Sequence, residues 1–460
     1  MLPPGMPAQR LFPAIALAIA ACAAQHYEAR PLESRSLASA FTARRLEDPD
    51  LATFAHPAEG EGSLRWDFEA LTRVALVQRP ELDVARTRID EARAAITTAG
   101  ARPNPTLSID PEVVTGADDP WILGWFLDIP LETAGKRGLR VRAAEEKLSA
   151  EEYGLPLAAW GIRVEVRRAL DELEAARTVA GNVEERRALE ERRLALQRAR
   201  LEAGAIDVLE LGRAEQSRAQ VEVLASDARE RSSRALSSLA VALGLPREAL
   251  ASARIDPSAA GVPAPPDVAG ARDLALANRL DLRAALADYA RTEAELELEI
   301  ARQYPDVHLV PGYNYDQGDH KISLGVSLEL PLFNRNEGPI AEAAARRAGS
   351  AARFEELQTS VLGAVESARV TYADALEREA NRSRALELAE AEERRVERAL
   401  GAGAVERLVL VEAGLARLAR ERERAEAHAD VLQALLRLED ALQCPLVGKD
   451  VLAPYREPTP

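Results

Sequence analysis

Apolar and polar residues follow a helical spacing over most of the chain. Residues 135–203 and 338–402 consist largely of Ala, Leu, Glu and Arg, with the period of an α-helix and few helix breakers. At a rise of about 1.5 Å per residue, about 65 residues make a helix roughly 100 Å long. A second helical stretch follows each of them, over residues 206–244 and 405–444. The sequence therefore predicts two pairs of long helices.

Glycines mark the expected turn within each pair, at Gly204 and Gly403. Helices often end at a residue with positive φ, which glycine adopts without steric cost. The segment Gly154-Leu155-Pro156 lies inside the first long stretch and should break that helix, because proline lacks the amide donor. The second long stretch has no such segment, so we expect the two pairs to differ there.

Two other segments alternate between apolar and polar residues, which predicts strands with one face in an apolar medium. With their partner strands, they give β-hairpins over residues 104–131 and 305–331. The apolar positions are Trp121, Leu123, Trp125, Leu127 and Ile129 in the first hairpin, and Ile322, Leu324, Val326, Leu328 and Leu330 in the second.

The hairpins have two properties of membrane strands. Tilted strands of about 9–11 residues can cross a bilayer, and Trp121, Trp125, Tyr313 and Tyr315 suit an aromatic belt at the lipid interface. Four strands cannot close a barrel, because the smallest membrane barrels have about eight. Either the hairpins are water-soluble and pack on helices, or several chains share one barrel; three chains would supply twelve strands.

The chain contains two copies of one unit. The segment that begins at Arg79 recurs at Arg279, and Ile129-Pro130-Leu131 recurs as Leu330-Pro331-Leu332. A repeat of this length indicates a duplicated domain rather than a solenoid. The expected organisation is a signal peptide (1–21), a surface segment (22–65), a first repeat (66–250), a linker rich in Pro, Ala and Gly (251–270), a second repeat (271–444) and a C-terminal tail (445–460).

Composition excludes several classes of function. The net charge of −16 leaves no basic face for nucleic acid. Cys22 and Cys444 are far apart and the five histidines show no ligand spacing, so we expect no metal site and no cofactor. The chain has no Gly-rich phosphate loop or nucleophile elbow, so we expect no enzyme. No apolar run of 18 residues follows the signal, and a membrane crossing would therefore require a closed barrel.

The first 22 residues have the features of a secretory signal. Arg10 precedes an apolar run that is too short for a transmembrane anchor. The run ends Ile19-Ala20-Ala21-Cys22, which resembles the bacterial lipobox, in which the cysteine becomes the lipidated N-terminus. We expect lipidation of Cys22, with an ordinary signal peptide as the alternative, and Met6 is an alternative start. Ala23 after the cysteine favours the outer membrane.

Taken together, the signal, the duplicated unit and the hairpins resemble the TolC-like outer-membrane efflux proteins over residues 66–444. Residues 331–338, Pro-Leu-Phe-Asn-Arg-Asn-Glu-Gly, resemble the CzcC-like heavy-metal branch, as do residues 133–137 and 44–49. The resemblance implies a mainly α fold whose trimer forms a twelve-stranded outer-membrane barrel and a long periplasmic helical tunnel. It also implies contacts with outer-membrane lipid, a periplasmic adaptor and an inner-membrane RND-type pump.

On this basis we expect a passive exit duct for heavy-metal cations, located in the outer membrane with most of its mass in the periplasm. One alternative is a duct for organic drugs or for a type I secretion system. A more remote alternative is a periplasmic coiled-coil lipoprotein that forms no channel.

The resemblance also assigns roles to the turns between the long helices. Residues 200–207 and 399–406 would contact the adaptor, through Gly204, Ala205, Gly403 and Ala404. Three copies of one acidic residue would form a ring that attracts cations. Each glutamate is equally compatible with a solvated helix face, and Val409 is apolar where some relatives carry an acidic residue. The gate candidates are Glu412, Glu210 and Glu406.

Asp128 and Glu329 are equivalent in the repeat and lie on the polar faces of their predicted strands. Inside a shared barrel they would favour cations. The alternative is ordinary polarity of the lumen, with Lys136, Arg137 or Arg335 as partners. His308 would face the same space, but a single histidine is no metal site.

Overall fold

The computed structural model describes residues 26–55, 66–116, 119–251, 253–256, 262–448 and 450–456. The chain divides into two compact units, Met1–Arg44 and Arg45–Pro460, and each is described by itself. The first unit contains α2 (Ser34–Ala43). The expected signal peptide and Cys22 lie outside the described residues.

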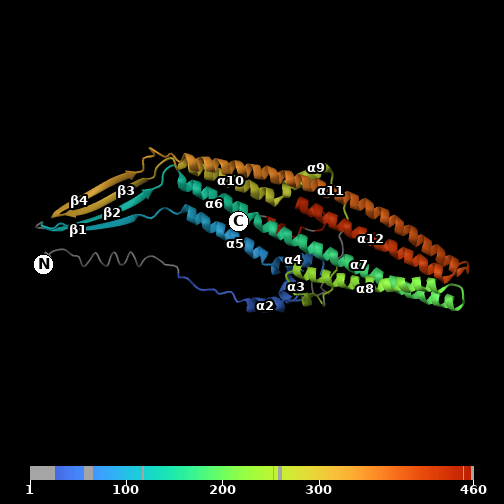
Figure 1. Ribbon diagram of the computed structural model, residues 1–460. Helices are drawn as coiled ribbons and strands as arrows, with labels where there is room; N and C mark the ends of the chain where they lie inside the picture. Colours follow the sequence, from blue (N-terminus) through green and yellow to red (C-terminus); the bar gives the residue numbers. More distant parts are fainter. Residues whose placement is uncertain are drawn as a thin grey trace. The chain divides into compact units, whose positions relative to one another are not determined.

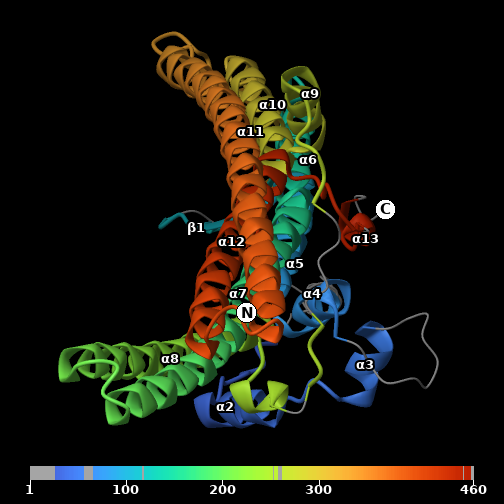
Figure 2. The ribbon, with the colours of Figure 1, turned by 90° about the vertical axis from the view of Figure 1, so that its right-hand side faces the viewer.

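Two pairs of long helices dominate the second unit (Figures 1 and 2). α7 (Gly154–Glu202) packs against α8 (Val208–Ala242), and α11 (Glu337–Gly401) packs against α12 (Arg407–Leu442). The expected break is confirmed, because α6 (Lys136–Glu152) ends just before Tyr153 and a new helix starts at Gly154. Pro156 lies in the first turn of α7, where its missing amide interrupts no helical bond. By contrast, α11 continues through 65 residues.

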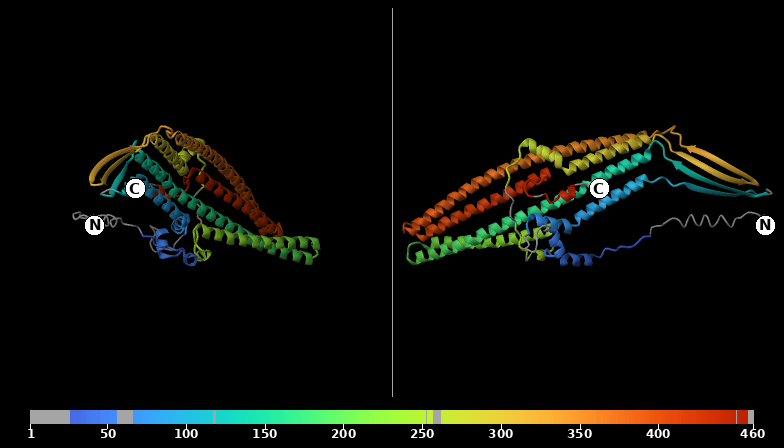
Figure 3. Two further views of the ribbon diagram at one scale, coloured as in Figure 1. Left: turned by 60° about the vertical axis from the view of Figure 1, so that its left-hand side comes forward. Right: turned by 180° about the vertical axis from the view of Figure 1, so that it is seen from behind.

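The helices lie side by side in a fixed order, which Figure 3 shows from two sides. α7 packs against α12 as well as α8, so the order towards the Gly turns is α8–α7–α12–α11. Towards the strands the order is α5 (Glu81–Gly100), α6, α10 (Leu280–Ala301) and α11. In both orders α11 lies at one edge and a helix of the first repeat lies at the other.

The two hairpins form one antiparallel sheet in the order β1–β2–β3–β4 (Figure 1). The strands are β1 (Thr106–Val113), β2 (Trp121–Leu131), β3 (Val307–Asp316) and β4 (Asp319–Leu328). Both predicted hairpins are confirmed, with β2 and β3 pairing across the two repeats. Each strand is connected directly to one of these helices: β1 follows α5, β2 precedes α6, β3 follows α10 and β4 precedes α11. The sheet therefore has the same order as the helices.

The register of the sheet aligns the apolar residues of all four strands. Ile109 is paired with Trp125, Trp125 with Tyr313, and Tyr313 with Ile322. Directly paired residues point to the same face of a sheet. The rings of Trp125 and Tyr313 stack with their centroids 6.4 Å apart. The predicted alternation therefore produces one continuous apolar face, and most of its large side chains are exposed.

Two large apolar cores hold the helices together, and a smaller cluster around Val183 and Val221 lies between α7 and α8. One surrounds Trp66, Trp160 and α4 (Phe68–Gln78), and the other lies between α9 (Val268–Asn278), α11 and α12. The segments before the first repeat and after the second contribute to the first core, because Leu46, Leu51 and Leu452 are buried in it. These segments are too short to show a period, although single residues in them are buried. The remaining short elements are α3 (Pro49–Ala55), η2 (Arg247–Leu250) and α13 (Ala453–Arg456).

None of the described helices is both long and apolar enough to span a membrane.

Candidate functional site

The turns between the long helices have the backbone geometry that their glycines predict. Gly204 has a φ of 69° and Gly403 a φ of 73°, so both lie in the left-handed region. Two main-chain bonds close each helix end, as in a Schellman motif, and all four predicted tip residues are exposed. The bonds run from Gly204 N to Leu201 O (2.9 Å), Ala205 N to Arg200 O (2.8 Å), Gly403 N to Leu400 O (2.9 Å) and Ala404 N to Ala399 O (2.9 Å).

An ion pair that is not predictable from the sequence pattern joins the two tips. Arg200 Nη1 lies 3.2 Å from Glu406 Oε2. Exposed pairs of this kind contribute about 0–1 kcal/mol, so the link is weak. It nevertheless compensates the charge of Glu406, one of the three gate candidates.

The other two gate candidates differ in their surroundings. Asp207 caps α8, with its Oδ1 accepting a bond from the amide of Glu210 at 2.9 Å. The carboxylate of Glu210 lies in the first turn of α8, where a negative charge suits the helix dipole, and this gives the residue a role in the helix itself. Glu412 is exposed on α12 and makes no ion pair within the described part of the chain. Glu210 is likewise exposed and without an ion pair in the described residues, so Glu406 is the candidate whose charge is compensated.

The two tips expose different apolar residues. Val208 and Leu209 are 71% and 72% exposed in the first turn of α8, whereas in α12 Leu408 is buried and Val409 is 40% exposed. The first tip therefore presents more apolar surface than the second. The sequence pattern points to Val409 alone and does not reveal this difference, because it depends on how each turn packs.

On the polar face of the sheet, Asp128 of β2 meets His308 of β3, with 2.8 Å between Oδ1 and Nδ1. The expected basic partners of Asp128 are wrong. Lys136 Nζ binds Asp306 at 2.8 Å, and Arg137 Nε donates to the carbonyl of Gly100 at 2.7 Å. The residue pattern of one strand does not determine its register with the neighbouring strand. The sequence therefore could not predict that His308 lies beside Asp128.

Glu329 does not occupy the predicted position. β4 ends at Leu328, and Glu329 is an exposed residue beyond the strand. Although Asp128 and Glu329 are equivalent in sequence, only Asp128 lies within the sheet. The pairing of β4 with β3 reaches only as far as Val307, where β3 begins, so nothing extends the ladder to Glu329.

Phe126 shares the polar face with Asp128 and requires a glycine beside it. A Cβ atom on Gly312 would lie 2.4 Å from the Phe126 ring. Gly312 is paired with Phe126 in the sheet, and its missing side chain leaves the space that the ring fills. An aromatic ring facing a glycine across two strands is a recognisable sequence signal once the register is known.

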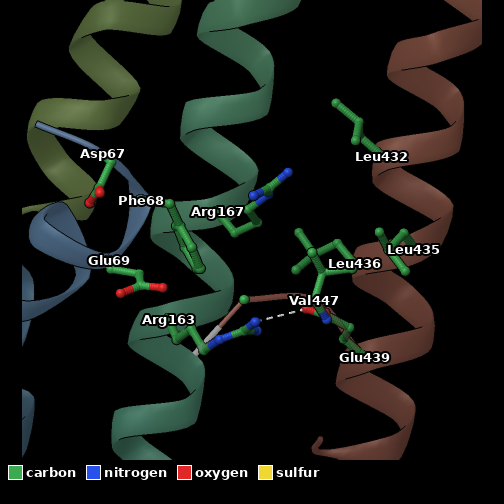
Figure 4. A pocket seen from close by; sticks show the side chains of 11 residues that line it. Asp67, Phe68, Glu69, Arg163, Arg167, Leu432, Leu435, Leu436, Glu439 and Val447 are labelled. Atoms are coloured by element: carbon green, nitrogen blue, oxygen red, sulfur yellow. Dashed lines mark hydrogen bonds and ion pairs between the residues drawn. The ribbon is translucent and has the colours of Figure 1, made fainter. Parts of the chain in front are cut away.

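A cavity of about 280 Å³ lies between the start of α4, α7 and α12 (Figure 4). Arg163 lines it and is 1% exposed. Its guanidinium lies between the rings of Phe68 (5.2 Å) and Trp160 (4.9 Å), and its Nη2 binds Glu439 Oε2 at 2.9 Å. The second oxygen of Glu439 accepts a bond from the amide of Leu446 at 2.8 Å. This arrangement joins the C-terminal segment to α7 and α12. We therefore interpret the residues around the cavity as structural.

Two further carboxylates affect how this region titrates. Burial raises the pKa of Asp171 to about 6, although Arg167 beside it favours the charged form. Burial also raises the pKa of Glu174. Among the described residues, no group of three or more His, Cys, Asp or Glu side chains is placed to hold a metal ion.

The comparisons with known proteins agree with one another. The family described as Outer membrane efflux protein matches residues 71–245 and 271–442. The cobalt-zinc-cadmium resistance protein CzcC of Cupriavidus metallidurans is 26% identical over 293 residues, which are 61% of this chain and 66% of that protein. The chain thus matches slightly less than two thirds of the length of this relative.

Solved structures share the fold. The outer-membrane channel OprN superimposes with a TM-score of 0.67 at 20% identity, covering 82% of this chain and 89% of that one. The outer membrane protein VceC of Vibrio cholerae gives a TM-score of 0.67 at 21% identity, covering 82% and 95%.

Proposed function

Because this chain belongs to the outer membrane efflux protein family, we propose that it forms the outer-membrane exit duct of a tripartite export system for heavy-metal cations. In this role three copies assemble into one channel. A periplasmic adaptor connects the channel to an inner-membrane pump of the RND type. The channel itself is passive, and transport is driven by the pump.

The single observation that carries the proposal is the four-stranded sheet, with one exposed apolar face and two free edges. In the described residues β1 and β4 each pair on one side only. Since β1 and β4 run in opposite directions, β4 of one copy can pair with β1 of the next as an antiparallel neighbour. Three copies would then close a twelve-stranded barrel without edges and with its apolar face towards lipid.

The helices support the same assembly. The edges of the sheet and the edges of the helix layer coincide, with α11 following β4 and α5 preceding β1. The contacts that close the sheet would therefore bring α11 of one copy next to α5 and α8 of its neighbour. The helices would then enclose a tunnel that continues the barrel.

The tips supply the proposed adaptor contact and gate. Gly204, Ala205, Gly403 and Ala404 are exposed at the turns, and the exposed Val208 and Leu209 next to them add an apolar contact surface. Glu412 is the gate residue that we favour, because Glu406 is paired with Arg200 and Glu210 lies in the first turn of α8, where the helix dipole already suits an acidic residue. Three copies of Glu412 would attract cations at the entrance.

The proposed cargo rests on CzcC, whose name connects that relative with cobalt, zinc and cadmium. Acidic residues along the route, Asp128 and Glu412, are compatible with cations. The direct test compares a deletion strain with its parent on zinc, cobalt, cadmium, nickel and copper salts, and on dyes and antibiotics. Sensitivity to metals alone is the expected result. Sensitivity to organic compounds alone would refute the cargo, and no sensitivity at all would refute the export role.

Complementation of that strain tests the gate. Wild-type protein should restore metal resistance, and Glu412→Gln should restore less of it. Glu387→Gln is the matched control, since Glu387 is an exposed glutamate of α11 that makes no ion pair in the described part of the chain. Equal complementation by the two variants would refute the role of Glu412.

A further inference from the structure

We propose that residues 329–336, which connect β4 to α11, form a lipid-binding surface that inserts Phe333 into the phospholipid leaflet at the helical end of the sheet. This inference rests on the proposed outer-membrane function. It concerns one turn of one repeat. We refer to these residues as the β4–α11 turn.

The β4–α11 turn exposes three large apolar side chains within four residues. Phe333 is fully exposed, Leu332 is 72% exposed and Leu330 is 63% exposed. Exposed apolar surface in a continuous group marks a binding site for an apolar partner, whereas single exposed residues need no explanation. The turn therefore has a partner that supplies apolar contacts.

Local hydrogen bonds hold the backbone of the turn in place. Asn336 has a φ of 62°, a conformation that asparagine tolerates better than most residues. Its Nδ2 donates to the main-chain oxygen of Glu299 in α10 at 2.7 Å, and its amide N donates to Asn334 Oδ1 at 2.9 Å. The amide of Leu332 donates to the Leu330 carbonyl at 2.8 Å. With the backbone fixed to α10, Phe333 stays outside instead of folding back onto the helices.

The apolar surface of the turn continues the apolar face of β4. Along the strand Ile322, Leu324, Val326 and Leu328 are all exposed and occupy alternate positions. Leu330 continues this series directly after the strand ends. The side chains on a strand stand perpendicular to the sheet and not towards a neighbouring strand. The turn therefore contacts the same medium as the apolar face of the sheet. This favours lipid as the partner over a second copy of the chain, which would pair at the edge of β4.

The position of the turn matches the boundary between hydrocarbon and water. Val307 pairs with both Leu131 and Leu328 at the last position of the sheet, and the helices begin just beyond it. Arg335 is exposed there and forms no ion pair within the described part of the chain. An aromatic residue next to a basic one suits this boundary, because the ring enters the apolar layer while the cation meets the phosphate groups.

The equivalent turn of the first repeat lacks this surface. Thr133 Oγ1 donates to the carbonyl of Pro305 at 2.7 Å, Lys136 is buried, and Glu132 is paired with Arg140. Polar side chains there bind the neighbouring segment, and Leu131 is the large apolar residue left exposed. The lipid-binding surface thus belongs to the second repeat.

A fluorescent label in the full-length protein tests the proposal. In a Cys444→Ser background, Phe333→Cys is labelled with the environment-sensitive fluorophore NBD and placed in vesicles of phosphatidylethanolamine and phosphatidylglycerol. Part of the lipid carries a nitroxide near the headgroup end of an acyl chain, which quenches nearby fluorophores. Ile322→Cys, on the exposed face of β4, is the control for membrane contact. Leu388→Cys, an exposed position on α11, is the control for water.

The expected result is loss of emission at positions 333 and 322, but not at 388, when nitroxide lipid is present. The parent without an introduced cysteine gives the background from Cys22. Quenching at 322 without quenching at 333 would overturn the lipid surface and leave the membrane function intact. If label 333 is shielded from both nitroxide lipid and aqueous iodide, a neighbouring chain covers the turn, which also overturns the proposal. Absence of quenching at 322 would instead refute the proposed function.

Discussion

The two repeats build the same arrangement of helices around different cores. In the first repeat the long helix is interrupted at Tyr153. The new helix carries Trp160, which donates to Asp440 of α12, and the buried Arg163, which binds Glu439. In the second repeat α11 is continuous, and two neutral polar contacts lie beside its core. The Tyr372 hydroxyl donates to the Pro263 carbonyl at 2.6 Å, and Gln443 Oε1 accepts from the amide of Leu280 at 2.8 Å. The same fold unit therefore accommodates a buried ion pair in one core and neutral hydrogen bonds in the other.

One contact is common to both repeats. Arg79 forms an ion pair with Glu81 and lies 3.5 Å from the carbonyl of Ala242, near the end of α8. Arg279 pairs with Asp281, and its Nη1 donates to the carbonyl of Ala441, near the end of α12, at 3.0 Å. In each copy an arginine thus holds the start of a short helix against the end of the returning long helix. The shared contact fixes the arrangement, which leaves the cores free to differ.

Substitutions that disrupt the two cores should give the largest difference in stability between the repeats. Arg163→Met leaves the buried Glu439 carboxylate without its cationic partner, and such a loss costs about 3–5 kcal/mol. Tyr372→Phe removes one hydrogen bond from the second core, which contributes about 0.5–1.5 kcal/mol. Unfolding followed by circular dichroism in detergent measures both. Similar shifts in the two variants would contradict the contrast between the cores.

The first core should also respond to pH. Because burial raises the folded pKa of Asp171 from 3.8 to about 6, the folded state holds this proton more tightly than the unfolded state does. Its contribution to stability is therefore present at low pH and is lost as pH rises from 3.8 towards 6. Comparing wild type with Asp171→Asn across this window isolates the effect. The stability of wild type relative to the variant should fall as pH rises, and a constant difference would contradict this.

The tips should behave alike, because their backbones are alike. Gly204→Ala and Gly403→Ala each force an alanine into the left-handed region, at about 1–2 kcal/mol. No atom lies within 4 Å of either added Cβ, so backbone strain is the whole effect. Gly363→Ala, inside α11 and equally open, should stabilise by about 0.5–1 kcal/mol. Thermal unfolding of the three variants distinguishes strain from crowding, and unequal losses at the two tips would contradict the equivalence.

The smallest effect is expected for the ion pair between the tips. A double-mutant cycle with Arg200→Gln and Glu406→Gln should give a coupling below about 1 kcal/mol, since both side chains are exposed. The coupling should decrease further at high salt, because ions screen exposed charges. A coupling that is large and independent of salt would show that the pair is buried in the assembly.

The elements with a strong period could be predicted from the sequence alone. The long helices, their glycine turns, the break near Pro156 and both hairpins follow from local patterns, and the repeat identified Arg79 and Arg279 as equivalent positions. The functions of these two arginines stayed hidden, because each binds a carbonyl more than 160 residues away in the chain.

The interactions that decide the candidate sites depend on distant pairing. His308 meets Asp128 only through the register of β2 and β3, and Arg200 meets Glu406 only after two turns are placed side by side. Neither contact leaves a local period. Burial of Leu46 and Leu452 was missed for a related reason, since one apolar residue in a short segment gives no period to recognise.

The pairing of β2 with β3 has a consequence for symmetry. It joins the hairpins of the two repeats in the same antiparallel manner in which neighbouring copies would join through β4 and β1. Six half-length chains could therefore form the same ring, with every hairpin and every tip identical. Fusion of two halves into one gene lowers the rotational symmetry from sixfold to threefold. Alternate positions around the ring are then free to diverge, as the β4–α11 turn and its counterpart have done.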